Sequence, residues 1–266
     1  MDLIQHFEEE IDGNLIILSL KNSEWNNFLL KLPLECRRCF IEDTDLAELI
    51  KNFSWCHETE MSEILPDDPS IKSWDFWEII TYFLFKEIYK RNSVDWPKKW
   101  QLKESKNVAA PYSDVILYSI KDMNNYSEDD LLISIESKMK ATANRSRHPI
   151  QLAIDWAKKD HITRRANSLA WLKKVYKTEA SKWIEQSKYI NLVKQVERFI
   201  NSEEFGEYSK VAHAIALVEQ SFLPDEKVKV INIPSELGVE FKVHLVWIEN
   251  IKEMYEKLYS EIKKLW

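Results

Sequence analysis

The chain has 266 residues, of which 45% are hydrophobic, and a formal net charge of −7, so it can form one large domain or two small ones with a substantial core. It contains three glycines, Gly13, Gly206 and Gly238, which leave no phosphate-binding loop, dinucleotide-binding turn or nucleophile elbow and so disfavour nucleotide-driven motors, kinases, Rossmann dehydrogenases and α/β-hydrolases. The three cysteines form no secreted disulfide framework and the acidic start "MDLIQHFEEEID" has no secretory-signal pattern, so we expect a cytoplasmic protein without membrane spans.

The first quarter of the chain is predicted to form a small α+β region. "NLIILSL" (14–20) is typical of a strand, and two short helical patterns follow at about 23–31 and 44–55. "LPDDPS" (65–70) is typical of a turn or linker. We therefore expect residues 1–70 to stand apart from the main domain and to be available for docking a partner.

The segment "WDFWEIITYFLFKEIYKR" (74–91) is apolar almost all round, which predicts a helix buried on most sides. Asp75 is expected to be its N-cap, and Glu78 would then be the third helical residue of a capping box. This capping role is the structural alternative to any chemical role of Glu78.

The rest of the chain is predicted to form a mixed α/β domain, residues 71–266, with a mainly β sheet covered by helices. Strands are expected at 98–105, 113–120, 131–138, 210–219, 227–234 and 240–248, and helices at about 149–177 and 182–202. A last helix is predicted from an apolar stripe that starts at Ile251 and ends at Leu265.

Charged residues end the apolar strand "LLISIESK" (131–138), where Glu136 and Lys138 fall on one face. Asp114 begins the preceding strand, so an antiparallel pairing brings its carboxylate beside that of Glu136. A divalent cation would relieve their repulsion, and oxygen ligands from Asp114, Glu136 and the carbonyl of Ser137 suit Mg²⁺ or Mn²⁺. Lys138 would then position an attacking water, which is the arrangement that phosphodiester hydrolysis needs. The alternative is an edge-strand salt bridge between Glu136 and Lys138.

The charge layout is uneven. Residues 138–177 carry 11 basic and 2 acidic side chains, a balance of +9, whereas residues 1–90 carry 8 basic and 19 acidic ones. A block of this kind predicts contact with the phosphates of a polyanion such as DNA, although a solvated helix face or an acidic partner protein would explain it as well. The expected DNA-binding residues are Lys140, Arg145, Arg147, His148, Lys158, His161, Arg164 and Arg165.

The pattern of Asp114 followed after 21 residues by Glu136-x-Lys138 resembles the PD-(D/E)xK nuclease superfamily. The longer run "WDFWEIITYFLF…WQLKESK…PYSDVILY…LLISIESK", closed by "HLVWIENIKEMYEKLYSEIKKL", resembles the HamA-type nuclease subunit of Hachiman antiphage defence. The resemblance implies a restriction-endonuclease-like mixed sheet flanked by helices. It also implies a site formed by Glu78, Lys103, Asp114, Glu136 and Lys138.

The resemblance further implies a Mg²⁺-dependent DNA nuclease that works with a HamB-like helicase subunit. Nothing in the sequence supplies a switch of its own, so we expect restraint to come from that partner. The residues by themselves are also compatible with two other functions. One is a non-catalytic adaptor with a nuclease-like fold that binds nucleic acid or a partner, and the other is a free-standing restriction-type endonuclease.

Overall fold

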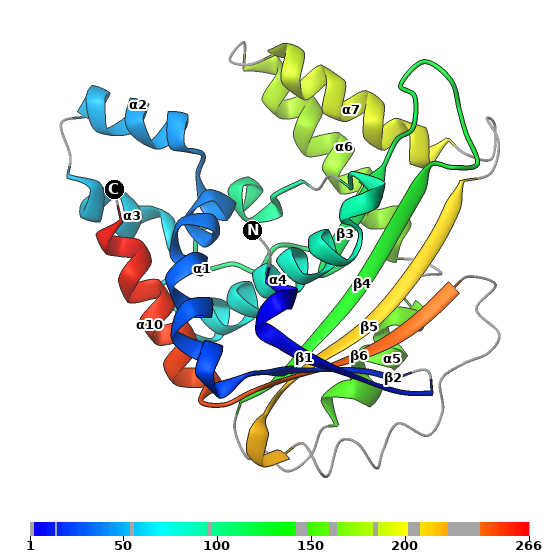
Figure 1. The fold of residues 1–266 in the computed structure, drawn as a ribbon. Helices are drawn as coiled ribbons and strands as arrows, with labels where there is room; N and C mark the ends of the chain where they lie inside the picture. The colour runs from blue at the N-terminus through cyan, green and yellow to red at the C-terminus, as the bar shows by residue number, and fades with distance from the viewer. Residues whose placement is uncertain are drawn as a thin grey trace.

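A computed structural model describes residues 3–13, 15–53, 56–94, 97–141, 148–159, 164–182, 186–201, 208–222 and 240–265. Its centre is a six-stranded sheet in the order β1-β2-β6-β5-β4-β3 (Figure 1). The strands are β1 (Phe7–Asp12), β2 (Leu15–Leu20), β3 (Val115–Ser119), β4 (Leu131–Lys140), β5 (Ser209–Glu219) and β6 (Glu240–Ile248). The four inner strands run parallel, while β1 and β3 are antiparallel edges.

Eight α-helices in the described part of the chain flank this sheet. They are α1 (Trp25–Phe40), α2 (Asp43–Phe53), α3 (His57–Ile64), α4 (Pro69–Ile88), α5 (Pro149–Lys159), α6 (Arg165–Ser181), α7 (Gln186–Ile200) and α10 (Ile251–Lys264). Helices α1, α4 and α10 cover one face, and α5 covers the other (Figure 1). The mixed α/β architecture is confirmed and is consistent with a restriction-endonuclease-like fold.

The position of strand β4 in the sheet explains why its sequence is apolar up to the charged residues at its end. It pairs with β3 on one side and β5 on the other, and residues 131–137 are all buried. Inner strands of largely parallel sheets are covered on both faces and therefore have nearly continuous apolar sequences. The charged residues Glu136 and Lys138 thus lie at the end of an inner strand, not on an exposed edge.

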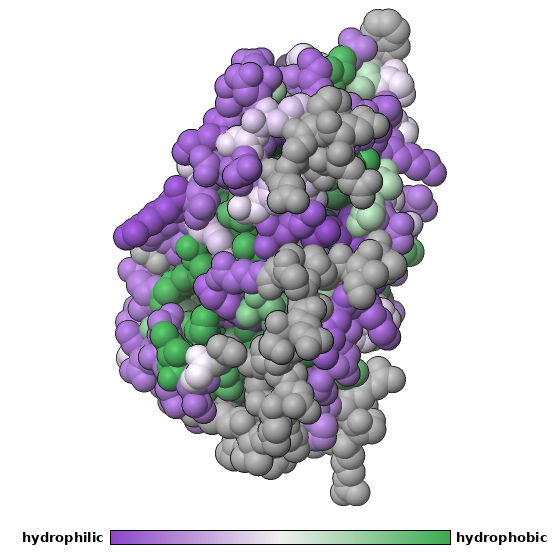
Figure 2. Space-filling view, turned by 90° about the vertical axis from the view of Figure 1, so that its right-hand side faces the viewer, coloured by the Kyte–Doolittle hydropathy of each residue, from purple (hydrophilic) through white to green (hydrophobic). Residues whose placement is uncertain are grey.

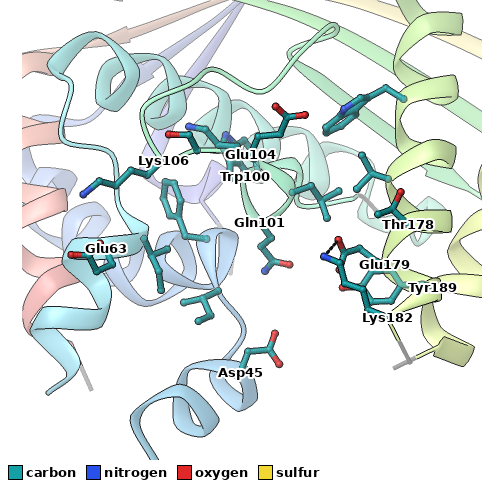
Figure 3. Close-up of a pocket in the computed structure, with 18 of the residues that line it drawn as sticks. Asp45, Glu63, Trp100, Gln101, Glu104, Lys106, Thr178, Glu179, Lys182 and Tyr189 are labelled. Carbon is teal, nitrogen blue, oxygen red and sulfur yellow. Dashed lines mark hydrogen bonds and ion pairs between the residues drawn. The ribbon is translucent and has the colours of Figure 1, made fainter. Parts of the chain in front are cut away.

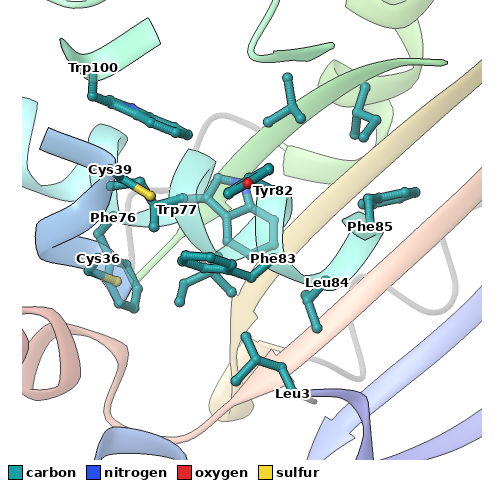
Figure 4. Packing of buried hydrophobic residues seen from close by; sticks show 14 of the residues in the cluster. Leu3, Cys36, Cys39, Phe76, Trp77, Tyr82, Phe83, Leu84, Phe85 and Trp100 are labelled. Carbon is teal, nitrogen blue, oxygen red and sulfur yellow. The ribbon is translucent and has the colours of Figure 1, made fainter. Parts of the chain in front are cut away.

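Helix α4 begins earlier than predicted. The Asp68 carboxylate accepts hydrogen bonds from the amides of Ser70 and Ile71, at 2.7 and 3.2 Å, and Pro69 is the first helical residue. The assignment of Asp75 as N-cap is therefore wrong, and Glu78 is not part of a capping box. Both acids lie inside the helix, whose aromatic side chains pack with the thiols of α1 and with Leu3 (Figure 4).

Several other predictions need correction. Residues 98–105 form no strand, because Lys99–Leu102 is a short 3₁₀ helix that buries Trp100. The helix predicted over 149–177 is described as α5 and α6, with residues 160–163 outside the described residues, as is the strand predicted at 227–234. Strand β1 was missed because its sequence, "FEEEID", buries only Phe7 and otherwise has the charged side chains typical of a protected edge.

The N-terminal residues share the main sheet and core. Strand β2 pairs with β6 in parallel, with Leu15 opposite Val243, and α1 packs against α10. Leu3, Phe28 and Cys36 belong to the same buried cluster as Ile133 on β4. The sheet and the core therefore continue across residue 70.

The surface is largely hydrophilic on the face shown in Figure 2, where apolar side chains gather in one smaller area of the described residues. None of the helices in the described ranges has the length and apolar character that crossing a bilayer requires.

Candidate active site

The register of β3 and β4 positions the central acids. Val115 pairs with Ile135 in antiparallel fashion, so Asp114, immediately before the first residue, meets Glu136, immediately after the second. The amide and hydroxyl of Ser137 both donate to Oδ2 of Asp114, at 2.8 and 3.0 Å. These hydrogen bonds fix the Asp114 carboxylate against the end of β4.

The Lys138 ammonium is the point at which three oxygens converge. Its Nζ lies 3.3 Å from Oδ2 of Asp114 and 2.9 Å from the carbonyl oxygen of Ser137, and it also contacts Oε1 of Glu136. Glu136 is only 1% exposed. A buried carboxylate requires a positive partner, which Lys138 provides.

The electrostatic balance favours the charged forms of Asp114 and Lys138. Burial works against ionisation of Asp114, but the charges of Lys138 and Lys99 and the Ser137 amide hold its pKa below the ordinary value. Burial also opposes the charge of Lys138, yet Asp114 and Glu136 raise its pKa. The site therefore combines a carboxylate and an ammonium in a partly dry environment.

A third acid of the site, Glu78 on α4, interacts electrostatically with Asp114. Its Oε2 lies 2.9 Å from Nζ of Lys99, and Lys99 also donates to the carbonyl of Ser113 at 3.1 Å. Burial raises the pKa of Glu78 to about 8, despite the charge of Lys99. Lys99 is 2% exposed, so the pair links α4 to the residue that precedes Asp114.

Arg164, which immediately precedes α6, closes the other side of the site. Its guanidinium donates to Oε2 of Glu136 at 3.1 Å and also to the carbonyl of Tyr112. The same guanidinium lies 5.1 Å from the ring centroid of Trp156 on α5. Arg164, one of the predicted DNA-binding residues, thus lies directly on a carboxylate of the site, and its contact with DNA stays a prediction.

One cleft of about 630 Å³ brings seven of the predicted residues together. Among those that line it are Glu78, Asp114, Glu136, Ser137, Lys138, Lys140 and Arg164. Lys158 on α5 and Arg165 on α6 are not among the described residues that line this cleft. Arg145, Arg147 and His161 lie outside the described residues.

Lys103 lies elsewhere. Its ammonium is 2.7 Å from Oδ2 of Asp75, and both side chains are buried. Lys99, four residues earlier, is the lysine that contacts the site. The sequence does not distinguish Lys99 from Lys103. A strand is predicted over both residues, whereas Lys99 begins a short 3₁₀ helix and Lys103 follows its end.

A larger cavity of about 750 Å³ lies away from these carboxylates (Figure 3). Its labelled residues come from the α2–α3 side, such as Asp45 and Glu63, and from the α6–α7 side, such as Glu179 and Tyr189. Its lining includes both acids and lysines, and Lys182 pairs with Glu179 at 2.6 Å. The described residues that line it do not include Asp114 or Glu136.

The donor set at the end of β4 fits a hard divalent cation. No group of three or more His, Cys, Asp or Glu side chains within the described ranges is arranged to hold a metal. Two carboxylates and one carbonyl, however, already face a single positive atom, Nζ of Lys138. Mg²⁺ is commonly held by one or two protein carboxylates with water and substrate oxygens as the other ligands. Asp114, Glu136 and the Ser137 carbonyl are therefore a suitable set.

Comparison with known proteins identifies the family. The HamA family model matches residues 4–262 of this chain, a range that runs from before β1 to α10 and includes the whole cleft. No curated protein matches the chain. The family match supports a role in Hachiman antiphage defence and implies a partner within that defence system. The chain belongs to the HamA family.

Proposed function

We propose that this chain is a metal-dependent DNA nuclease and the effector of a defence complex with a helicase subunit. The observation that carries the proposal is the convergence of Asp114, Glu136 and the Ser137 carbonyl on the Lys138 ammonium, in a cleft that other cations line. Three cations, Lys138, Lys140 and Arg164, beside two carboxylates that could hold a metal suit a phosphodiester substrate.

Each side chain has a role that follows from its contacts. Asp114 and Glu136 would hold the cation, and the amide of Ser137 keeps Asp114 in place. A bound Mg²⁺ or Mn²⁺ would supply Lewis-acid polarisation of the scissile phosphate. Lys138 hydrogen-bonds the attacking water and offsets negative charge that develops on the phosphate.

Four further residues support the site, namely Glu78, Lys99, Arg164 and Lys140. Glu78 holds Lys99, and Lys99 holds the carbonyl of Ser113 next to Asp114. Arg164 donates a hydrogen bond to the second carboxylate oxygen of Glu136. Its guanidinium also lines the cleft, where it can attract a phosphate of the substrate. Lys140, the last residue of β4 and part of the basic block of residues 138–177, adds a further positive charge to the cleft.

A nuclease without sequence readout needs restraint. Lys138, Lys140 and Arg164 in the cleft offer charges that suit phosphates, and no motif in the sequence suggests that base edges are read. We therefore assign control to the defence-system partner, which we propose to be an ATP-consuming helicase that tests DNA and releases the nuclease.

The experiment is cleavage of plasmid and linear DNA by the chain, alone and with its co-purifying partner, in Mg²⁺ and in EDTA. We expect cleavage in Mg²⁺ only, and its loss in Glu136→Ala/Lys138→Ala. The matched control is Glu179→Ala/Lys182→Ala, which removes an acid–lysine pair at the C-terminal end of α6 that lines the larger cavity and not the cleft, and it is expected to cut like wild type. Equal cutting by the Glu136/Lys138 double variant would show the site assignment to be wrong.

A further inference from the structure

We infer that the cleft takes DNA with unpaired bases and stacks them on exposed aromatic side chains at its edge. This inference rests on the nuclease function proposed above and names the form of its substrate. The observation behind it is that three exposed aromatic side chains, Trp74, Tyr112 and Trp156, all line the cleft that contains Asp114 and Glu136.

The exposure of these side chains differs from that of most aromatic residues in the described part of the chain, which are buried or half-buried. Trp74 is 54% exposed, Tyr112 41% and Trp156 39%. Large apolar side chains left in water beside a polar site usually mark a binding surface. Trp74 precedes Glu78 by four residues on α4, so the helix presents both side chains on one face.

Tyr112 is held at the cleft by an uncommon backbone conformation. Its φ is 69°, in the left-handed region that bulky residues rarely adopt. Its carbonyl accepts a hydrogen bond from Arg164, which also contacts Glu136. One side chain therefore connects the segment that carries the exposed tyrosine to a predicted metal ligand.

Trp156 is part of a cation–aromatic group. The Arg164 guanidinium and the Lys159 ammonium lie 5.1 and 4.7 Å from its ring centroid. Arginine planes and aromatic rings are the surfaces on which bases of single strands stack, while cations beside them bind the backbone. A nucleotide stacked here would have its phosphate close to Glu136, since Arg164 contacts both the ring and that carboxylate.

Stacking favours unpaired bases over a duplex. In a double helix the faces of each base are covered by its neighbours, so an aromatic side chain can reach them only where the strands have separated or ended. Every base has such a face, so this recognition needs no sequence readout. The cations Lys138, Lys140 and Arg164 in the same cleft match the charge of the backbone.

The test measures stacking separately from cleavage. The full chain in EDTA is titrated into a 12-nucleotide oligo-dT that carries one 2-aminopurine, and into a hairpin duplex that carries the same probe within its stem. We expect quenching of 2-aminopurine and tight binding with the single strand only. Trp74→Ala is expected to lower affinity for the single strand about 5- to 100-fold, the size of one base–aromatic stack, and Trp74→Phe to restore most of it.

The matched control is Phe53→Ala, which removes an aromatic side chain 57% exposed on α2 that does not line the cleft, and we expect it to bind like wild type. The inference is overturned if the single strand does not bind, if the duplex binds and quenches equally, or if Trp74→Ala and Trp156→Ala bind like wild type. A Trp74→Ala chain that binds DNA normally but loses its co-purifying partner would assign these aromatics to a protein interface. Normal quenching without cleavage in Mg²⁺ would refute the nuclease function and leave the stacking site in place.

Discussion

The ammonium of Lys138 lies 3.3 Å from Oδ2 of Asp114, although the two residues belong to different strand segments 24 positions apart. The antiparallel register of β3 and β4 creates this contact, and the amide of Ser137 donates to the same oxygen. The carboxylate therefore accepts a fixed set of donors before any substrate is bound. Such preorganisation lowers the cost of arranging charge around a reacting phosphate.

Removal of the Lys138 charge should separate metal binding from cleavage. In Lys138→Ala the oxygens of Asp114, Glu136 and Ser137 lose their positive neighbour, so Mn²⁺ should bind at least as tightly as in wild type while cleavage is lost. Calorimetric titration with Mn²⁺ measures the first effect and DNA cleavage the second. Asp114→Ala is the comparison, because it removes a proposed ligand and should weaken Mn²⁺ binding. Loss of Mn²⁺ binding in Lys138→Ala would contradict the assignment of these oxygens.

Truncation of Arg164 should lower the cleavage rate more than truncation of its neighbour Arg165. Arg164→Ala removes from Oε2 of Glu136 the guanidinium that now lies at 3.1 Å, and a buried acid that loses a positive neighbour becomes harder to ionise. We expect at least a tenfold loss of cleavage rate. Arg165→Ala is the matched control, since Arg165 is not among the described residues that line the cleft, and it should alter DNA affinity without a comparable loss of rate. Equal losses in the two variants would argue for a general charge effect.

The Asp75–Lys103 ion pair should matter for stability and not for chemistry. Both side chains are buried, with 2.7 Å between charged atoms, and removal of one member of such a pair typically costs about 3–5 kcal/mol because the other charge remains uncompensated. We therefore expect Asp75→Leu to lower the free energy of unfolding strongly and Asp75→Leu/Lys103→Met to recover most of the loss. Urea unfolding measures both.

The exposed Glu261–Lys264 pair on α10 is the control for this comparison, and Lys264→Ala should cost less than about 1 kcal/mol. A double variant as unstable as Asp75→Leu alone would mean that packing, and not the unpaired charge, sets the loss.

Two buried histidines should make the fold sensitive to acid. His213 and His244 on neighbouring strands lie 3.1 Å apart between Nδ1 and Nε2, and the hydroxyl of Tyr89 is 2.7 Å from Nε2 of His213. Burial lowers the pKa of His213 well below its usual value and that of His244 to about 3. Below pH 6 the unfolded chain therefore binds two protons that the folded chain excludes.

The stability contributed by these neutral rings is present above pH 6.5 and falls as the pH is lowered. We expect it to be lost at about 2.7 kcal/mol per pH unit between pH 6 and pH 4, in addition to the effect of other groups. His244→Gln should reduce that slope by about half, and the exposed His148→Gln serves as the control. Unfolding free energies across this range provide the measurement, and identical slopes for wild type and His244→Gln would contradict the expectation.

Hydrophobic periodicity predicts most of the strands and helices, because each of these elements buries an apolar run or stripe of its own sequence. The strands at β2, β3, β4, β5 and β6 and the helices at α7 and α10 follow from apolar runs and stripes that each element buries. The misassignments occurred where local pattern and tertiary burial differ. Residues 98–105 alternate like a strand but curl into a 3₁₀ turn to bury Trp100, and α4 begins at Pro69 because Asp68 caps it.

The sequence by itself determined that Asp114 and Glu136 meet, because the strand pattern and the connection between the strands imply an antiparallel pairing, and register follows from which residues are buried. Only the tertiary structure decided which cations and aromatic rings surround them. Lys99, Arg164, Trp74 and Trp156 come from elements distant in sequence, and their approach depends on how helices α4, α5 and α6 pack on the sheet. That packing is set by the summed burial of many side chains, so no short segment of the sequence encodes it.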